Sequence, residues 1–178
     1  MQERVKQQKG FTIVELLIVI VVIAILAAIT VVAYTGIQNR AQNTQTVSAT
    51  TTYLKAMMQY KAENGIYPDT YNSGYHITCL GGVENATNCD GNDSLTRYNM
   101  LHTALEPYMS SRPNPSYAGR INGNWSGTIY TYSSGFGGYY FLMSQYGTTD
   151  CPDMSGMSLY SKSVYGADVG CRYILPDQ

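Results

Sequence analysis

Residues 9–33 read KGFTIVELLIVIVVIAILAAITVVA, and from Phe11 onwards this run is apolar except for two threonines and Glu15. A helix over Phe11–Ala33, rising about 1.5 Å per residue, is long enough to cross a hydrocarbon layer about 30 Å thick. Ile18–Ile23 is an unbroken series of β-branched residues, typical of a buried strand, but no turn residue divides the run into strand lengths. A helix also satisfies its own backbone hydrogen bonds in lipid. The sequence therefore predicts a membrane-spanning helix.

The helix is predicted to continue past the apolar run. Residues 34–63 contain no proline and a single glycine, Gly36, while Gly65 offers a left-handed C-cap and Pro68 a stop. A helix over residues 11–64 would be about 80 Å long. Its second half carries a weak stripe of apolar or small residues at helical spacing, which we expect to face a core. The stripe consists of Ile37, Ala41, Val47, Thr51, Leu54, Met58 and Ala62.

The composition changes after Gly65. Fourteen of the 17 tyrosines lie in this part, together with many glycine, serine, threonine and asparagine residues. We expect Ser94 to cap a short amphipathic helix that ends at Pro107. Glycines at 135–138 favour a hairpin between two of three strand-like segments. The expected strands are Trp125–Ser133, Tyr139–Tyr146 and Cys171–Leu175. The predicted fold class is therefore α+β, with a long N-terminal α-helix packed on a small antiparallel β-sheet.

Four cysteines, an even number, lie in the polar part of the chain: Cys79, Cys89, Cys151 and Cys171. No pair has Cys-x-x-Cys spacing, and the two histidines, His76 and His102, do not complete a zinc pattern. Two disulfides formed in an oxidising compartment are the better interpretation, and four cysteines allow three pairings. We favour Cys79–Cys89 and Cys151–Cys171, because each closes a local loop rich in turn-forming residues.

Composition and charge argue against several classes of function. The formal net charge of −1 supplies no basic excess for nucleic-acid phosphates, and we interpret Arg97, Arg112 and Arg120 as a solvated face. The chain has no Gly-x-Ser-x-Gly and no Walker loop, and two histidines leave little for acid–base work. We therefore expect no enzyme activity, cofactor or metal. Asp90–Ser94 lacks the distal glutamate of a calcium loop and is interpreted as a turn.

Glu15 is the residue of the apolar run that most needs an explanation. A carboxylate five residues into a membrane helix is costly unless it is paired. A cut between Gly10 and Phe11 would create a new α-amine at the start of the same helix. If the amine of one copy met Glu15 of another, both charges would be neutralised and an axial stagger between the helices would be favoured. The residues therefore indicate pairing between copies of this helix.

The segment KGFTIVELLIVIVVIAILAAI resembles the N-terminus of type IV pilins and of the related pseudopilins of type II secretion. The resemblance covers residues 1–64. It implies that a prepilin peptidase cuts between Gly10 and Phe11, that Phe11 is N-methylated, and that Glu15 assists assembly. The implied division of the chain is a leader over residues 1–10, a transmembrane and filament-core helix over 11–35, an amphipathic continuation over 36–64, and a globular domain over 65–178 with a disulfide loop at Cys151–Cys171.

The resemblance also implies a location and partners. A single helix would anchor the chain in the inner or cytoplasmic membrane before assembly, and the chain would then join an extracellular filament that is a helical homopolymer. The implied partners are the prepilin peptidase, a membrane platform protein and an assembly ATPase, and the implied roles are adhesion, twitching motility or DNA uptake. Many relatives carry a proline midway along the N-terminal helix, whereas this chain has none between Phe11 and Ile66.

Four other interpretations stay open. A plain single-span membrane anchor would never polymerise. A pseudopilin would form a short periplasmic rod without a surface fibre. A low-abundance tip pilin would use loop tyrosines such as Tyr71, Tyr75 and Tyr165 to contact a surface or ligand. An ordinary secretory signal, cut after about Ala28, would release a secreted domain. We interpret the tyrosines of the expected strands as half-buried sheet residues rather than a contact surface; they are Tyr130, Tyr132, Tyr139 and Tyr140.

Overall fold

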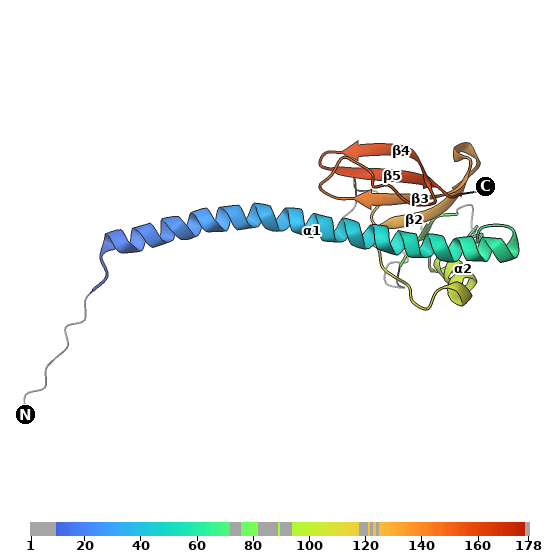
Figure 1. The fold of residues 1–178 in the computed structure, drawn as a ribbon, viewed down its shortest axis with the longest axis horizontal. Helices are drawn as coiled ribbons and strands as arrows, with labels where there is room; N and C mark the ends of the chain where they lie inside the picture. The colour runs from blue at the N-terminus through green and yellow to red at the C-terminus, as the bar shows by residue number, and fades with distance from the viewer. Residues whose placement is uncertain are drawn as a thin grey trace, which may run out of the picture. The chain divides into compact units, whose positions relative to one another are not determined.

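The computed structural model describes residues 10–71, 76–81, 89, 94–117, 121, 123 and 125–176. The chain divides into two compact units, residues 1–37 and 38–178. The elements, most of them labelled in Figure 1, are α1 (Ile13–Asn64), β1 (Thr78–Cys79), α2 (Leu95–Leu105), the 3₁₀ helix η2 (Glu106–Tyr108), β2 (Thr128–Ser133), the 3₁₀ helix η3 (Ser134–Phe136), β3 (Gly138–Gln145), β4 (Ser158–Tyr165) and β5 (Asp168–Ile174). The expected α+β class is confirmed.

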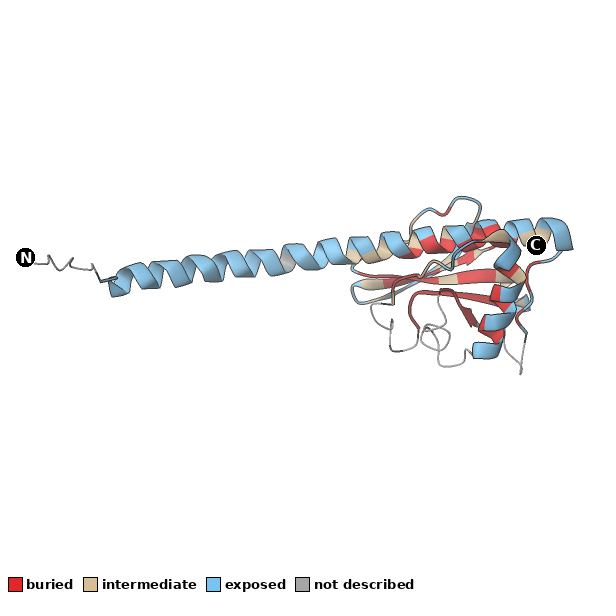
Figure 2. Cartoon of the chain, turned by 90° about the horizontal axis from the view of Figure 1, so that it is seen from below, coloured by how far each residue is buried: buried red, intermediate tan, exposed pale blue. Residues whose placement is uncertain are grey.

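The first unit holds the apolar half of α1. The helix begins at Ile13, two residues later than expected. Every described side chain of residues 10–37 is exposed, and Figure 2 draws this part of the helix in pale blue. Within the part of the chain that the structure describes, α1 is the one helix long and apolar enough to cross a membrane. An apolar surface of this extent needs lipid or a protein partner to cover it.

The end of α1 agrees with the prediction. The helix stops at Asn64, and Gly65 adopts φ +79°, the left-handed conformation that glycine takes without steric cost. The Gly65 N–H donates to the Lys61 carbonyl at 2.8 Å, which satisfies one of the carbonyls left open at a helix end.

The second half of α1 packs through a different face from the expected stripe. Ile37 and Met58 are exposed, as are Ala41 and Ala62, so most of the predicted stripe is wrong, and within it Leu54 is the one fully buried position. The buried positions do recur at helical spacing, one residue away from the predicted ones. They are Thr46, Ala49, Thr50, Tyr53, Leu54, Ala56 and Met57.

Threonines can lie on this buried face because their hydroxyl groups are satisfied within the helix. Thr46 donates to the Gln42 carbonyl at 2.9 Å, and Thr50 donates to the Thr46 carbonyl at 2.8 Å. Such bonds to the preceding turn are typical of threonine in helices and remove the cost of burying the hydroxyl. The small side chains then let the sheet approach closely, and Thr50 Oγ1 lies 2.8 Å from Thr128 Oγ1 on β2.

The second unit contains a five-stranded antiparallel sheet in the order β1-β2-β3-β5-β4. Three strands were predicted, with slightly different bounds. Trp125 precedes β2 and forms only an isolated bridge with Ile121. The Gly-rich hairpin is confirmed, with η3 and Gly137, at φ +88°, between β2 and β3. Its register pairs Tyr130 with Phe141.

The sequence analysis missed β4 and the two-residue β1. β4 reads SLYSKSVY, and six of its eight residues are exposed, so neither face shows the apolar and polar alternation of a half-buried strand. It lies at the edge of the sheet, where β5 is the one strand that pairs with it. Strand pairing, rather than burial, therefore makes this segment a strand.

The core of the second unit lies between α1, α2 and the sheet. Tyr53 and Met57 of α1 pack with Leu101 of α2 and with Tyr130 and Phe141 of the sheet. α2 begins as predicted, since the Ser94 hydroxyl accepts a hydrogen bond from the Arg97 N–H at 3.3 Å. Two disulfides cross-link this unit, Cys79–Cys89 and Cys151–Cys171, and both have Cα atoms 5.7 Å apart.

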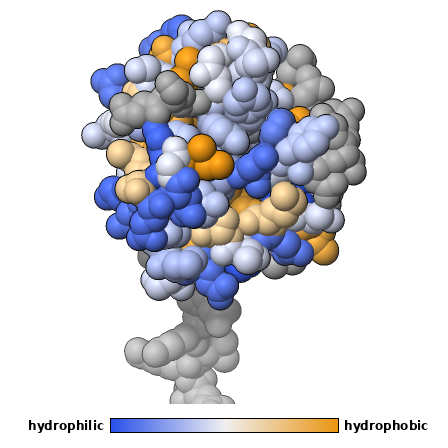
Figure 3. Space-filling view, turned by 90° about the vertical axis from the view of Figure 1, so that its right-hand side faces the viewer, coloured by the Kyte–Doolittle hydropathy of each residue, from blue (hydrophilic) through white to orange (hydrophobic). Residues whose placement is uncertain are grey.

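Figure 3 shows the end of the second unit at which α1 stops. Apolar residues on this face form small separate patches among polar ones. The face therefore differs from the first half of α1, whose side chains are apolar and exposed without interruption over many residues.

Candidate functional site

Thr12 and Glu15 hold each other at the first turn of α1. The Thr12 backbone N–H and hydroxyl both donate to Glu15 Oε2, at 2.8 and 2.7 Å, and the Glu15 N–H donates to Thr12 Oγ1 at 3.2 Å. This arrangement is a capping box, in which the residue before the helix and the third helical residue satisfy each other's polar groups. It also places the carboxylate at the positive end of the helix dipole.

Glu15 remains able to accept a further partner. Both Thr12 donors converge on Oε2, so Oε1 accepts no hydrogen bond from a described residue. A carboxylate has about four acceptor positions, and a cation can therefore bind Oε1 without breaking the capping box. Gly10 and Phe11, the expected cleavage site, come directly before and are exposed, Phe11 by 83%.

Thr12 is a site residue that the sequence analysis missed. The signal was present, because threonine followed three residues later by glutamate, ahead of an apolar run, is the sequence pattern of a capping box. Glu15 therefore has a partner within its own helix turn, in addition to the partner in another copy that the sequence predicts.

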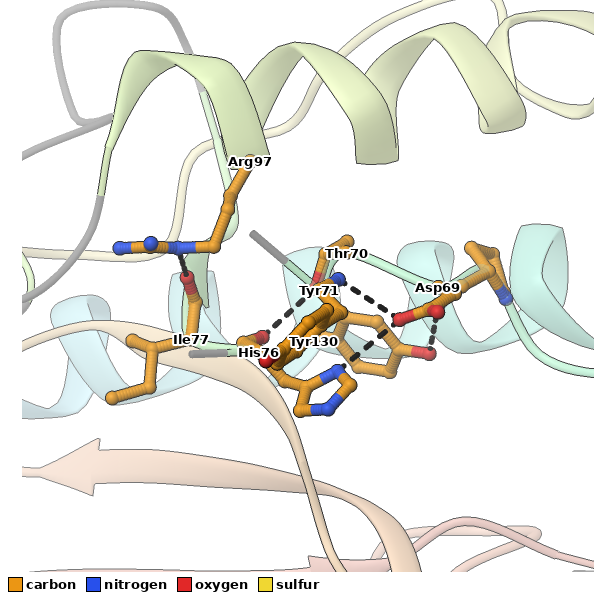
Figure 4. Close-up of polar contacts among 8 residues, drawn as sticks. Asp69, Thr70, Tyr71, His76, Ile77, Arg97 and Tyr130 are labelled. Atoms are coloured by element: carbon orange, nitrogen blue, oxygen red, sulfur yellow. Dashed lines mark hydrogen bonds and ion pairs between the residues drawn. The ribbon is translucent and has the colours of Figure 1, made fainter. Parts of the chain in front are cut away.

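Polar contacts after α1 form a second cluster, drawn in Figure 4. His76 Nδ1 lies 3.1 Å from Asp69 Oδ1, which also accepts a hydrogen bond from the Tyr71 N–H at 2.9 Å. The Thr70 hydroxyl donates to the His76 carbonyl at 2.8 Å. Because a carboxylate accepts hydrogen bonds, Nδ1 is the donor. Nε2 of His76 has no hydrogen-bond partner among the described residues.

Aromatic rings continue from this cluster in a row, which we call the aromatic row: Tyr71, His76, Tyr132 and Tyr139. Successive ring centroids are 4.8, 5.1 and 5.0 Å apart. Tyr71 is 54% and Tyr132 is 38% exposed. Burial, followed by the charge of Asp69, raises the pKa of Tyr139 to about 12, so its hydroxyl stays protonated at neutral pH.

The strand tyrosines are less uniform than predicted. Tyr130 and Tyr140 are buried, Tyr139 is half-buried and Tyr132 is exposed. Tyr130 stacks on Tyr139 with centroids 5.5 Å apart, and its hydroxyl donates to the Pro68 carbonyl at 2.7 Å. Among the expected loop contact residues, Tyr71 is exposed and Tyr165 is half-buried, while Tyr75 lies outside the described residues.

α2 carries a buried histidine. His102 is 2% exposed, and its ring lies 4.1 Å from that of Tyr98 and 5.6 Å from that of Tyr53. Neither ring nitrogen has a hydrogen-bond partner. Burial, reinforced by the positive charge of Arg112, lowers the pKa of His102 to about 4. The imidazole is therefore neutral at pH 7 and packs as a core side chain.

The predicted arginine face is not formed by the described residues. Arg97 is 3% exposed, and its Nε donates to the Ile77 carbonyl at 2.7 Å, as Figure 4 shows. Arg112 is exposed, and its guanidinium lies 5.8 Å from the Tyr98 ring. Arg120 lies outside the described residues, as do residues 90–93 of the expected turn. In the described parts of the chain, no three His, Cys, Asp or Glu side chains gather in a way that would hold a metal.

Comparison with known proteins identifies the N-terminal segment. Residues 5–31 match the family model of the prokaryotic N-terminal methylation motif. A type IV major pilin of Neisseria gonorrhoeae is 37% identical over 67 residues, which are 38% of this chain and 31% of that protein. A fimbrial protein of Eikenella corrodens is 36% identical over 80 residues, covering 44% and 52% of the two chains.

A second group of relatives belongs to secretion systems. The type II secretion system core protein G of Klebsiella michiganensis is 36% identical over 67 residues, covering 38% of this chain and 47% of that protein. The chain thus spans about a third to a half of the length of these relatives. No solved structure was found to match it. This chain therefore carries the prokaryotic N-terminal methylation motif around Gly10, Phe11 and Glu15, and its relatives are type IV pilins and the core pseudopilin of type II secretion systems.

Proposed function

We propose that this chain is a pilin-type subunit that polymerises into a filament through the apolar half of α1. The observation that carries the proposal is the exposed apolar surface of residues 13–31, with the Glu15 carboxylate held at its first turn. Moving this surface from lipid into a bundle of identical helices keeps its hydrophobic stabilisation. Identical contacts that do not close into a ring generate an open helical fibre.

Charge pairing would set the register between subunits. A prepilin peptidase would cut between Gly10 and Phe11 and leave an α-amine beside Thr12. In the filament, the Phe11 amine of one copy donates to Oε1 of Glu15 in another, while Thr12 keeps its bonds to Oε2. Such a charge-assisted bond is strong in a low-dielectric bundle. N-methylation of the amine preserves its charge, so a methylated Phe11 can make the same contact.

The first test is the N-terminus of the mature protein. Intact-mass and N-terminal analysis of the protein from its native host should find Phe11 as the first residue, with the mass of one added methyl group. An N-terminus near Ile29 would instead identify an ordinary secreted domain without the apolar helix, and would overturn the proposal.

The second test addresses Glu15. Glu15→Val, which is neutral and compatible with lipid, should leave the chain in the membrane fraction but abolish filaments in sheared surface material. Glu106→Gln is the control, because this exposed glutamate follows α2 and is remote in sequence from the motif. Normal filament yield from Glu15→Val would refute the pairing role of the carboxylate.

A pseudopilin is the second candidate, favoured by the match to core protein G at nearly the same identity as the match to the pilin. Both candidates would use the same processing, a membrane platform protein and an assembly ATPase. Abundance separates them, since a major pilin dominates sheared surface material and a pseudopilin is absent from it. A surface filament would serve adhesion, twitching motility or DNA uptake.

A further inference from the structure

A pocket of about 420 Å³ lies where α1 ends and meets the hairpin between β2 and β3. Its walls include the rings of Tyr67, Tyr132 and Tyr139, and Gly137 and Gly138 lie between them. Both glycines have positive φ, +88° and +128°, and carry no side chain to fill the space. The volume is within the range of small-molecule sites, about 300–1,000 Å³.

The aromatic walls are held in place from behind. The Tyr67 hydroxyl donates to the Pro176 carbonyl at 2.8 Å, which fixes its ring. Tyr139 stacks on the buried Tyr130, with an angle of 8° between the rings. Tyr132 is backed by His76, which is itself held by Asp69. A site whose walls are fixed before binding loses little entropy when a ligand enters.

The residues around the pocket argue against a metal ion, a cationic ligand and a broad protein partner. Among the described lining residues none is Asp, Glu, His or Cys, so a metal ion finds no ligands here. The Lys61 ammonium lies 4.8 Å from the Tyr67 ring centroid and donates to the Pro176 carbonyl at 3.3 Å, and its charge disfavours a cationic ligand. The apolar patches of this face are small and separate in Figure 3, unlike a broad protein-docking surface.

We propose that this pocket binds a pyranose ring of a saccharide. A pyranose has an apolar C–H face and hydroxyl groups at its edge, which match the ring faces of Tyr132 and Tyr139 and the hydroxyl at the tip of each tyrosine. The Tyr132 hydroxyl has no hydrogen-bond partner among the described residues and can bond a sugar hydroxyl. This proposal does not depend on filament assembly.

Saturation-transfer NMR on the full chain tests this site. The chain is held in micelles of a zwitterionic detergent that carries no sugar, and the probes are methyl β-D-glucopyranoside and methyl N-acetyl-β-D-glucosaminide. We expect saturation to reach the ring C–H protons of at least one probe, with a dissociation constant on the order of 1 mM. Tyr132→Ala should weaken binding about tenfold through the loss of stacking, whereas Tyr132→Phe keeps the ring and should weaken it less.

Tyr165→Ala is the matched control, because Tyr165 is a half-buried tyrosine of the same unit that does not line the pocket. It should bind like the unmodified chain, and near-ultraviolet circular dichroism checks that each variant is folded. No transfer to either probe would overturn the proposal, as would equal transfer in Tyr132→Ala. Stronger transfer to a proline-rich peptide that displaces the sugars would identify a peptide site instead.

Discussion

Asn43 and Tyr146 exchange two hydrogen bonds although 103 residues separate them. The Asn43 side-chain amide donates to the Tyr146 carbonyl at 2.9 Å, and its oxygen accepts from the Tyr146 N–H at 2.8 Å. The amide thus satisfies both backbone groups of the residue that follows β3, where the sheet ladder has ended. α1 is thereby tied to the end of β3 by one side chain.

We therefore expect Asn43→Ala to destabilise the second unit by about 1–3 kcal/mol, because both Tyr146 backbone groups lose their partner. Urea unfolding of the full chain in micelles measures the change. Thr44→Ala is the control, since the exposed Thr44 hydroxyl donates to the Arg40 carbonyl of its own helix at 2.8 Å, and its effect should stay within about 0.5 kcal/mol. Equal losses in the two variants would contradict the role given to Asn43.

The capping box predicts that Thr12→Ala frays the start of α1. The Glu15 carboxylate would lose the Thr12 hydroxyl as a donor and keep only the backbone N–H of residue 12, and the Glu15 N–H would lose the Thr12 hydroxyl oxygen as its acceptor. Hydrogen exchange at the amides of residues 13–16 in micelles should become severalfold faster. Thr12→Ser keeps the hydroxyl and should exchange like the unmodified chain. Unchanged exchange in Thr12→Ala would show that the box does not stabilise the helix start.

Because the pKa of the buried His102 is lowered, we expect the folded protein to lose stability in acid. Its folded pKa of about 4 lies below the unfolded value of about 6.5, so the unfolded chain binds more protons between these two values. The free energy of unfolding should therefore fall as the pH drops from about 6.5 towards 4, and the protonation of His102 should account for about 3 kcal/mol of this fall. Above pH 7, His102 is neutral in both states and should not change the stability with pH.

His102→Phe isolates this term, because phenylalanine can occupy the space between Tyr53 and Tyr98 without taking up a proton. Urea unfolding at pH 7.5 and pH 4.5 should show a smaller acid loss in the variant than in the unmodified chain. Carboxylates contribute equally to both proteins and cancel in the difference. An identical pH dependence would mean that His102 does not resist protonation in the folded state.

The Cys151–Cys171 disulfide joins the loop before β4 to the middle of β5, 20 residues further along the chain. The double substitution Cys151→Ala and Cys171→Ala should lower the free energy of unfolding by about 3 kcal/mol, because the unfolded chain gains conformational entropy without the cross-link. The loss should be smaller for the Cys79–Cys89 pair, which spans 10 residues. Thermal unfolding of the two double variants gives the comparison. A larger loss for the shorter loop would indicate that these disulfides stabilise the protein mainly through packing in the folded state and not through the entropy of the unfolded loop.

The sequence alone determined the features that depend on neighbouring residues. The apolar run, the left-handed stop at Gly65, the Ser94 cap and the Gly-rich hairpin after β2 each rest on signals that lie within a few positions of one another. The methylation motif around Glu15 is likewise a continuous stretch, so the comparisons found it without the rest of the fold. The Thr12 cap belongs to the same class and could have been predicted.

Tertiary structure decided which of several possible faces and edges are used. The buried face of α1 runs through Thr46, Thr50 and Tyr53 because their polar groups find partners in the helix, in β2 and at Gly81, which no local pattern specifies. Arg97 is buried because the Ile77 carbonyl accepts its Nε, and β4 is a strand because β5 pairs with it. The aromatic row and the Asn43–Tyr146 bonds join distant segments. These contacts stabilise the protein only when the distant segments come together, so they cannot be predicted from either segment by itself.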